Sequence, residues 1–215
     1  MLGVFVYIIF ARDVVVLYNY IVKYFIGGIN GVGKSHFLKR LNEKNPNYVM
    51  VDGAREFMEW LGFGNDYEKL RHLHPSIRDS RLSEFISQTL NNTRAETLMY
   101  AGHLLVLIRG EIAYAAREWL ARFDGIVLLT ASPEVILKRI AGDERDRALF
   151  KENTPQEEAI KILKDYNLKE NVEFLRVADQ YGLPSLLINN SDGIEEHTIS
   201  QFLDFDARVR RSYEL

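Results

Sequence analysis

The glycine-rich stretch "FIGGINGVGKSHF", residues 25–37, restricts the possible folds of this chain more than any other feature. Gly28, Gly33, Lys34 and Ser35 match G-x-x-x-x-G-K-[ST] at every fixed position. The match follows an apolar run and precedes an amphipathic pattern, so it lies between an expected strand and an expected helix. Backbone N–H groups of such a loop converge on phosphate oxygens at the helix N-terminus. The sequence therefore predicts a nucleotide-phosphate site.

The residue types of this loop have separate roles. Glycine at positions 28, 31 and 33 permits backbone angles and close approaches that a side chain would block. Lys34 is expected to reach the terminal phosphates, and the Ser35 hydroxyl is expected to ligate Mg²⁺. The alternative is a glycine-rich turn with a chance lysine, and the position between strand and helix argues against it.

Composition limits the class of protein. The 215 residues suit one domain, and 47% hydrophobic with 27% charged residues is typical of a soluble globular protein. A net charge of −3 disfavours a sequence-independent nucleic-acid binder. The absence of cysteine excludes disulfides, thiolate zinc sites and cysteine nucleophiles. A cytoplasmic protein is the expectation.

The first 28 residues are apolar, but Arg12, Asp13 and Lys23 interrupt them. The longest uncharged run is 11 residues, against about 20 for a membrane-spanning helix. We therefore expect no membrane segment and no secretory signal. Residues 1–20 are expected to be an extension of undetermined role, such as a strand or hairpin beside the strand that ends at Ile26. Translation from an upstream start codon is the alternative.

Apolar runs and helical patterns alternate along residues 21–215. We expect strands at residues 20–27, 48–52, 103–108, 125–130 and 184–189. Helical patterns lie at residues 35–44, 54–61, about 76–100, 111–123 and 133–141, and in the long stretch that follows residue 151. This alternation predicts a three-layer α/β/α P-loop NTPase fold with a five-stranded, mostly parallel sheet.

Two groups of arginines are candidates for the charge neutralisation that phosphoryl transfer requires. Arg139, Arg145 and Arg147 follow the fourth strand, and an R-x-R in a mobile lid could close over ATP. The alternative for them is a solvated charged loop. A second group surrounds a proline-initiated helix and is a candidate clamp for an acceptor phosphate; it comprises Arg71, Arg78 and Arg81. The alternative is salt bridging on the helix surface with Asp66, Glu68, Asp79 and Glu84.

These motifs together resemble the archaeal-type adenylate kinases. "GFGNDYEKLRHLHP" is similar to their nucleoside-monophosphate-binding region, and "SPEVILKRIAGDERDR" to their helix and short lid. "INNSDGIEEHTISQFL" is similar to their last strand and the loop beside the adenine. The resemblance spans about residues 24–205 and implies phosphoryl transfer from ATP, with Mg²⁺, to a nucleoside monophosphate. Residues 53–102 would form the monophosphate-binding region and residues 142–153 the lid.

The resemblance also implies roles for single residues. Transfer would be catalysed by Lys34, Arg139, Arg145 and Arg147. The implied ATP-binding residues are Gly28, Asn30, Gly31, Val32, Gly33, Lys34, Ser35, His36 and Asn190. The expected acceptor-binding residues are Asp52, Arg71 and Arg78, and Arg109, which lies where the sequence departs from that family, is a further candidate to meet the acceptor.

The sequence departs from that family after the expected third strand. Those kinases carry Asp-Thr-His there, whereas this chain has Arg109, Gly110 and Glu111. Glu111 could replace the aspartate by orienting Mg²⁺-bound water, which makes it a candidate metal ligand beside Ser35. Equally, Glu111 could only favour a helix N-terminus. Specificity for AMP is therefore an open expectation.

Two other function classes stay open. The first is a P-loop ATPase or GTPase that acts as an assembly or processing factor. The chain has no N-K-x-D motif, and its apolar strands do not end in paired carboxylates, so a kinase is favoured. The second is a kinase that acts on another small acceptor. No nucleic-acid or membrane partner is expected, and the oligomeric state is left open.

Overall fold

A five-stranded parallel sheet forms the centre of the computed structural model, which describes residues 6–7, 10–11, 14–15, 18–114, 118–142, 149–193 and 195–213. The strand order is β11-β10-β5-β7-β6, so the strand before the P-loop is central. The strands are β5 (Val22–Gly27), β6 (Tyr48–Asp52), β7 (Thr97–Ala101), β10 (Gly125–Thr130) and β11 (Ser185–Asn189).

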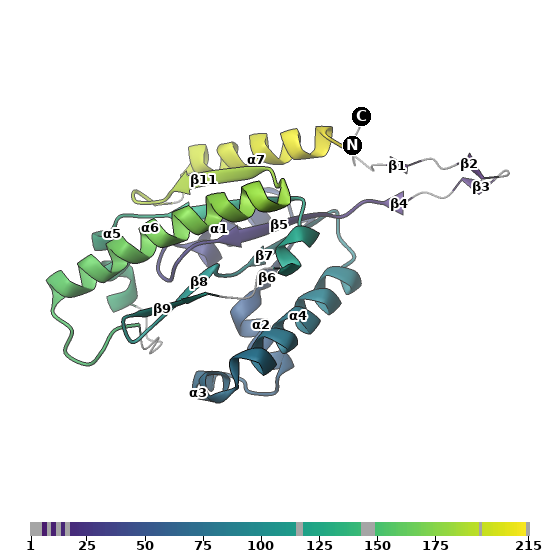
Figure 1. Ribbon diagram of the computed structural model, residues 1–215. Helices are drawn as coiled ribbons and strands as arrows, with labels where there is room; N and C mark the ends of the chain where they lie inside the picture. Colours follow the sequence, from purple (N-terminus) through teal and green to yellow (C-terminus); the bar gives the residue numbers. More distant parts are fainter. Residues whose placement is uncertain are drawn as a thin grey trace.

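Helices cover both faces of this sheet (Figure 1). One face packs on α1 (Lys34–Lys44) and α7 (Glu196–Arg211). The other packs on α2 (Gly53–Trp60), α4 (Pro75–Asn92), the 3₁₀ helix η1 (Glu118–Arg122) and α6 (Gln156–Tyr181). The described residues also form α3 (Tyr67–His72) and α5 (Pro133–Ala141).

Strand periodicity divides the core between these two helical layers. Along β5, Tyr24 and Ile26 lie in the cluster with α1 and α7, whereas Phe25 lies in the cluster with α2, α4 and η1. All three side chains are fully buried, as expected for a parallel strand covered on both faces. The predicted three-layer P-loop fold is confirmed.

The third strand of the sheet is not the predicted one. β7 lies between β5 and β6, and all of its residues are buried. Residues 103–108 instead contain β8 (Leu105–Ile108), which pairs antiparallel with β9 (Glu111–Tyr114) in a separate hairpin. The predicted helix at residues 111–123 is therefore wrong, and the helix predicted to continue to Tyr100 ends at Asn92. Periodicity alone does not separate a short apolar strand from the end of a buried helix.

The hairpin is closed by a turn that the sequence pattern did not indicate. Ile108 pairs with Glu111, so the turn consists of Arg109 and Gly110. Their φ angles are 50° and 83°, and two positive values are typical of the type I′ turn that matches strand twist. Asparagine or aspartate is usual at the first position of such a turn, so the pair Arg109–Gly110 does not match the sequence pattern that predicts a hairpin.

The N-terminal extension contains two short antiparallel strand pairs. β1 (Val6–Tyr7) pairs with β4 (Tyr18–Asn19), and β2 (Phe10–Ala11) pairs with β3 (Val14–Val15). These pairs form separate two-stranded sheets and do not join the central one (Figure 1). Within the described part of the chain, none of the helices has the length and apolar character needed to cross a membrane.

Candidate nucleotide and acceptor site

The P-loop joins β5 to α1, and its backbone requires glycine. The φ angles of Gly28, Gly31 and Gly33 are 138°, 86° and 99°, values that side-chain-bearing residues rarely adopt. A Cβ on Gly28 would lie 2.5 Å from the carbonyl oxygen of Leu129, and one on Gly33 would lie 2.5 Å from Asn190 Nδ2. The glycines predicted from the motif are therefore fixed by backbone angle and by close packing.

Lys34 is the first residue of α1, and its side chain contacts the loop that precedes it. Its ammonium donates hydrogen bonds to the carbonyl oxygens of Gly28 at 2.6 Å and Ile29 at 3.2 Å. This places the positive charge at the loop, where the motif expects a phosphate. Ser35 and His36 follow in the first turn and are exposed, so the Ser35 hydroxyl is accessible.

Arg139 and Asn190 both bind the P-loop backbone. Asn190 is 1% exposed, and its Nδ2 donates to the carbonyl oxygen of Val32 at 2.5 Å. Arg139 Nη1 donates to the same carbonyl at 3.3 Å, and Nη2 donates to the carbonyl oxygen of Asn190 at 2.9 Å. Burial lowers the pKa of Arg139. The structure thus places both predicted residues at the loop, with the Asn190 side chain beneath it; a contact of Asn190 with adenine stays a prediction.

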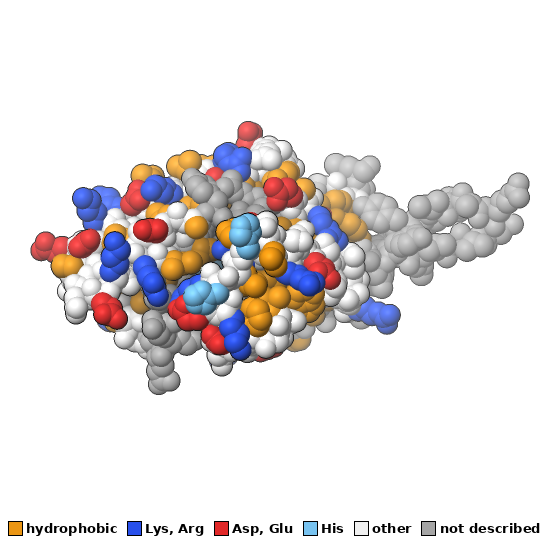
Figure 2. Space-filling view, turned by 60° about the horizontal axis from the view of Figure 1, so that its bottom comes forward, with side chains coloured by type: hydrophobic (Ala, Val, Ile, Leu, Met, Phe, Trp, Pro, Cys, Tyr) orange, Lys and Arg blue, Asp and Glu red, His pale blue; other side chains and the backbone are white. Residues whose placement is uncertain are grey.

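A second part of the site is a pocket of about 470 Å³, lined by residues of α2, α3, α4 and the β8–β9 hairpin. Arg71, Arg78 and Arg109 all line it, so three of the four predicted acceptor residues lie together. The fourth, Asp52, caps the N-terminus of α2 and immediately precedes Gly53 in the lining. On the face that carries α3 and α4, charged and histidine side chains surround a hydrophobic area (Figure 2).

The three arginines of this pocket differ in their partners. Arg71 is paired with Glu68, and Arg78 Nε lies 3.1 Å from Asp79 Oδ1, as the salt-bridge alternative predicted. Arg109 has no ion pair within the described ranges, and it occupies the left-handed region at φ 50°. Arg109 is exposed, whereas Arg71 and Arg78 each hold a carboxylate partner.

The rest of the pocket is largely apolar. Phe57, Tyr100 and Trp119 contribute aromatic side chains, and Leu70 and Val106 contribute aliphatic ones. Burial raises the pKa of Tyr100, which keeps its hydroxyl neutral. A pocket of this kind suits a small ligand with a flat apolar body and an anionic group.

Strand register brings the P-loop and this pocket to one edge of the sheet. Asp52 pairs with Ala101 across β6 and β7, and Ala101 pairs with Ile26 across β7 and β5. Gly53 follows Asp52 and Gly102 follows Ala101, and both glycines line the pocket. The P-loop begins two residues after Ile26. Ligands of open parallel sheets bind at these carboxyl ends.

Two further groups of predicted site residues have different outcomes. Glu111 is an exposed residue of the hairpin, so the expectation that it follows the third strand of the central sheet is wrong, and its role as a metal ligand stays a prediction. Arg145 and Arg147 lie outside the described residues. Within the described ranges, no three acidic, histidine or cysteine side chains are grouped as metal ligands.

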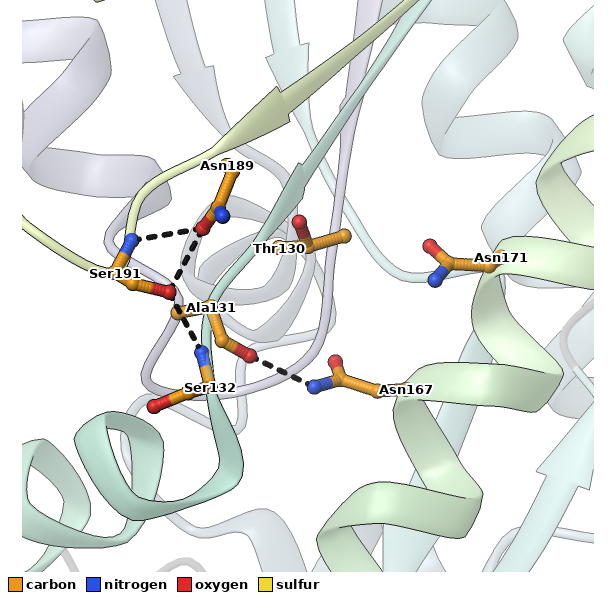
Figure 3. A pocket seen from close by; sticks show the side chains of 7 residues that line it. All are labelled: Thr130, Ala131, Ser132, Asn167, Asn171, Asn189 and Ser191. Carbon is orange, nitrogen blue, oxygen red and sulfur yellow. Dashed lines mark hydrogen bonds between the residues drawn. The ribbon is translucent and has the colours of Figure 1, made fainter.

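A smaller pocket of about 280 Å³ lies against α6 at the carboxyl ends of β10 and β11 (Figure 3). Its uncharged polar groups largely bind one another: Ser191 Oγ donates to Asn189 Oδ1 at 2.7 Å, and Asn167 Nδ2 donates to the carbonyl oxygen of Ala131 at 2.8 Å. Among the residues that the structure describes, none of those that line this pocket is a lysine or arginine. Cationic side chains are present at the P-loop, in Lys34, and in the arginine-lined pocket.

Sequence reasoning missed the β8–β9 hairpin and the α6 residues that hold it. Glu170 accepts hydrogen bonds from the backbone N–H groups of Leu104 at 3.3 Å and Leu105 at 3.0 Å. A glutamate within a helical pattern gave no signal of its burial, because charged residues usually occupy the solvated face.

Comparison with known proteins supports the fold. No protein-family model and no curated protein matches the sequence. The structure is similar to a shikimate kinase from Bacteroides thetaiotaomicron, with 15% identity, a TM-score of 0.56, and coverage of 90% of this chain and 99% of that one. It is also similar to a shikimate kinase from Acinetobacter baumannii in complex with shikimate, with 17% identity, a TM-score of 0.59, and coverage of 87% and 94%. The chain therefore has the three-layer P-loop fold of these kinases.

Proposed function

We propose that this protein is an ATP-dependent phosphotransferase that transfers the γ-phosphoryl group to a nucleoside monophosphate. The observation that carries the proposal is the position of the P-loop and the arginine-lined pocket at one edge of the sheet. ATP phosphates would bind the loop at Lys34, and the acceptor would occupy the pocket beside it. Two anionic substrates in adjacent sites are what phosphoryl transfer requires.

The lining of the pocket favours a nucleotide acceptor. Its volume of about 470 Å³ is within the usual range for small-molecule sites. Phe57, Tyr100 and Trp119 offer apolar surface for a base, while Arg71 and Arg109 offer charge for its phosphate. The resemblance to the adenylate kinases, found from the sequence, supports the same acceptor.

The reaction moves one phosphoryl group between two oxygens. The bond from the γ-phosphorus to the β–γ bridging oxygen breaks, a bond to an acceptor oxygen forms, and ADP leaves. Lys34 and the arginines act by neutralising charge on the transferred group, without covalent chemistry. Mg²⁺, when bound to the nucleotide, neutralises phosphate charge. The Ser35 hydroxyl is exposed in the first turn of α1 and is an oxygen donor of the kind that Mg²⁺ prefers, so Ser35 would hold it.

A hydroxy acid is the second candidate acceptor. One structural neighbour was solved in complex with shikimate, a small carboxylate that carries hydroxyl groups. The arginines of the pocket would bind a carboxylate in the same manner as a phosphate. The two candidates differ in their contacts with the aromatic side chains of the pocket, which would pack against the base of a nucleoside monophosphate.

A coupled assay of ADP release tests these proposals. Purified protein is incubated with ATP and Mg²⁺, and with AMP, CMP, GMP, UMP or shikimate in turn, against a control without acceptor. Stimulation by one monophosphate supports the first proposal, and stimulation by shikimate alone supports the second. A rate that no acceptor raises above the control contradicts both and favours an ATPase.

Asn190→Ala is expected to raise the KM for ATP about two- to tenfold, because the P-loop loses the hydrogen bond to Val32. The KM for the acceptor should stay within twofold in the same assay, because Asn190 does not line the acceptor pocket. Asn189→Ala is the matched control, since this neighbouring amide is exposed and faces the smaller pocket. Equal KM values for ATP in the two variants would contradict the role of Asn190.

A further inference from the structure

The β8–β9 hairpin forms one wall of the acceptor pocket. Val106, Ile108 and Arg109 from β8 and the turn, and Ala113 from β9, all line it. The hairpin pairs only with itself and not with the central sheet, in the part of the chain that the structure describes. Two isolated strands are marginally stable in water, so the position of this wall depends on other contacts.

Helix α6 provides those contacts where the hairpin begins. Glu170 accepts hydrogen bonds from the N–H groups of Leu104 and Leu105, at 3.3 and 3.0 Å. Tyr166, one turn earlier on the same helix, donates from its hydroxyl to the carbonyl oxygen of Leu105 at 2.7 Å. Glu170 is 2% exposed and Tyr166 is 1% exposed, so these bonds are shielded from water.

The other end of the hairpin is also held. The N–H of Gly110 donates to the carbonyl oxygen of Leu149 at 2.8 Å. A Cβ on Gly110 would lie 3.7 Å from Ile162 of α6, so the turn approaches the same helix. Contacts at both ends fix where Arg109 lies relative to the pocket.

A buried carboxyl group at this position is costly unless it binds specific partners. Burial raises the pKa of Glu170 to about 7, while the N–H groups of Leu104 and Leu105 and the charge of Lys34 lower it. Glu173 from the same helix opposes the ionised form. An apolar residue would pack there at lower cost, but it would leave the two N–H groups without an acceptor.

We propose that Glu170 and Tyr166 are positioning residues that hold the β8–β9 hairpin as the specificity wall of the acceptor pocket. The inference rests on the proposed function, because it assigns this pocket to the acceptor. Neither residue lines the pocket itself, so both act through the backbone of Leu104 and Leu105.

Hydrogen–deuterium exchange tests the positioning without any substrate. In Glu170→Gln, amide exchange at Leu104 and Leu105 is expected to be roughly tenfold faster than in the wild type, because one oxygen acceptor is lost. Glu173→Gln is the matched control: it changes another buried glutamate of α6, which pairs with Arg176 at 2.7 Å. Exchange that is equal in the two variants would overturn the inference.

Kinetics test whether this positioning governs the acceptor. Tyr166→Phe removes the hydrogen bond to Leu105 and leaves the charge of Glu170 near Lys34 unchanged. This variant therefore tests the effect of the hairpin on acceptor binding without changing the charge next to the P-loop lysine. We expect a KM for the best acceptor of the panel that is about three- to tenfold higher, with the KM for ATP within twofold. A general loss of stability would instead lower the active fraction and leave both KM values unchanged.

The outcomes separate the two proposals. Faster exchange with an unchanged acceptor KM in both Glu170→Gln and Tyr166→Phe would overturn the inference while the kinase assignment stands. If no acceptor of the panel is phosphorylated, the proposed function fails, and the exchange comparison alone decides whether Glu170 holds the hairpin.

Discussion

Lys34→Ala is expected to lower the rate of acceptor-dependent ADP release roughly 10²- to 10³-fold, the usual effect of removing one preorganised charge from a transition state. The ammonium lies 2.6 Å from the Gly28 carbonyl oxygen at the P-loop, where it can move from backbone to phosphate. Because developing charge on the transferred group is greatest in the transition state, the loss should fall mainly on kcat.

The matched control for this prediction is Lys39→Ala, which removes an exposed lysine from the same helix, five residues further on. Its turnover should equal that of the wild type. Thermal unfolding of Lys34→Ala should also be close to wild type, because the side chain is only partly buried. Unchanged turnover in a stable Lys34→Ala variant would contradict the nucleotide site.

Arg109→Gly should move stability and acceptor binding in opposite directions. We expect the KM for the acceptor to rise about tenfold to a hundredfold, because a charge-assisted pair with the anionic group is lost. The free energy of unfolding should stay the same or rise by up to about 1 kcal/mol, since glycine accepts φ 50° without strain. ADP release at varied acceptor and a urea titration measure the two effects.

Arg81→Ala is the matched control for the loss of charge, because Arg81 pairs with Glu84 and does not line the pocket. Arg71→Ala should have a smaller effect than Arg109→Gly, since Arg71 is paired with Glu68 and must leave that pair to bind an anion. If Arg71→Ala has the larger effect, the phosphate binds on the α3 side of the pocket and Arg109 is not its main contact.

The sequence by itself determined the P-loop and the class of fold. Gly28 to Ser35 carry a local signal, because phosphate binding by a loop requires glycines and a lysine at fixed spacing. The strands at 48–52 and 125–130 were predicted at their observed bounds, because apolar runs ended by turn residues determine strands locally. Of the predicted clamp, Arg71 and Arg78 line one pocket together with the separate candidate Arg109, whereas Arg81 does not line it.

The tertiary structure alone decided which apolar run became the central strand. "TLMYA" and "HLLVLI" are both short and apolar, and only packing placed β7 in the sheet and β8 in the hairpin. Tertiary packing also decided that the side chain of Asn190 is buried beneath the P-loop and that the side chain of Glu170 is buried beneath the hairpin. Their partners are 158 residues away at Val32 and 65 residues away at Leu105. The residue pattern of one helix or one strand does not predict hydrogen bonds between residues this far apart, because burial of a polar side chain depends on the element that packs against it.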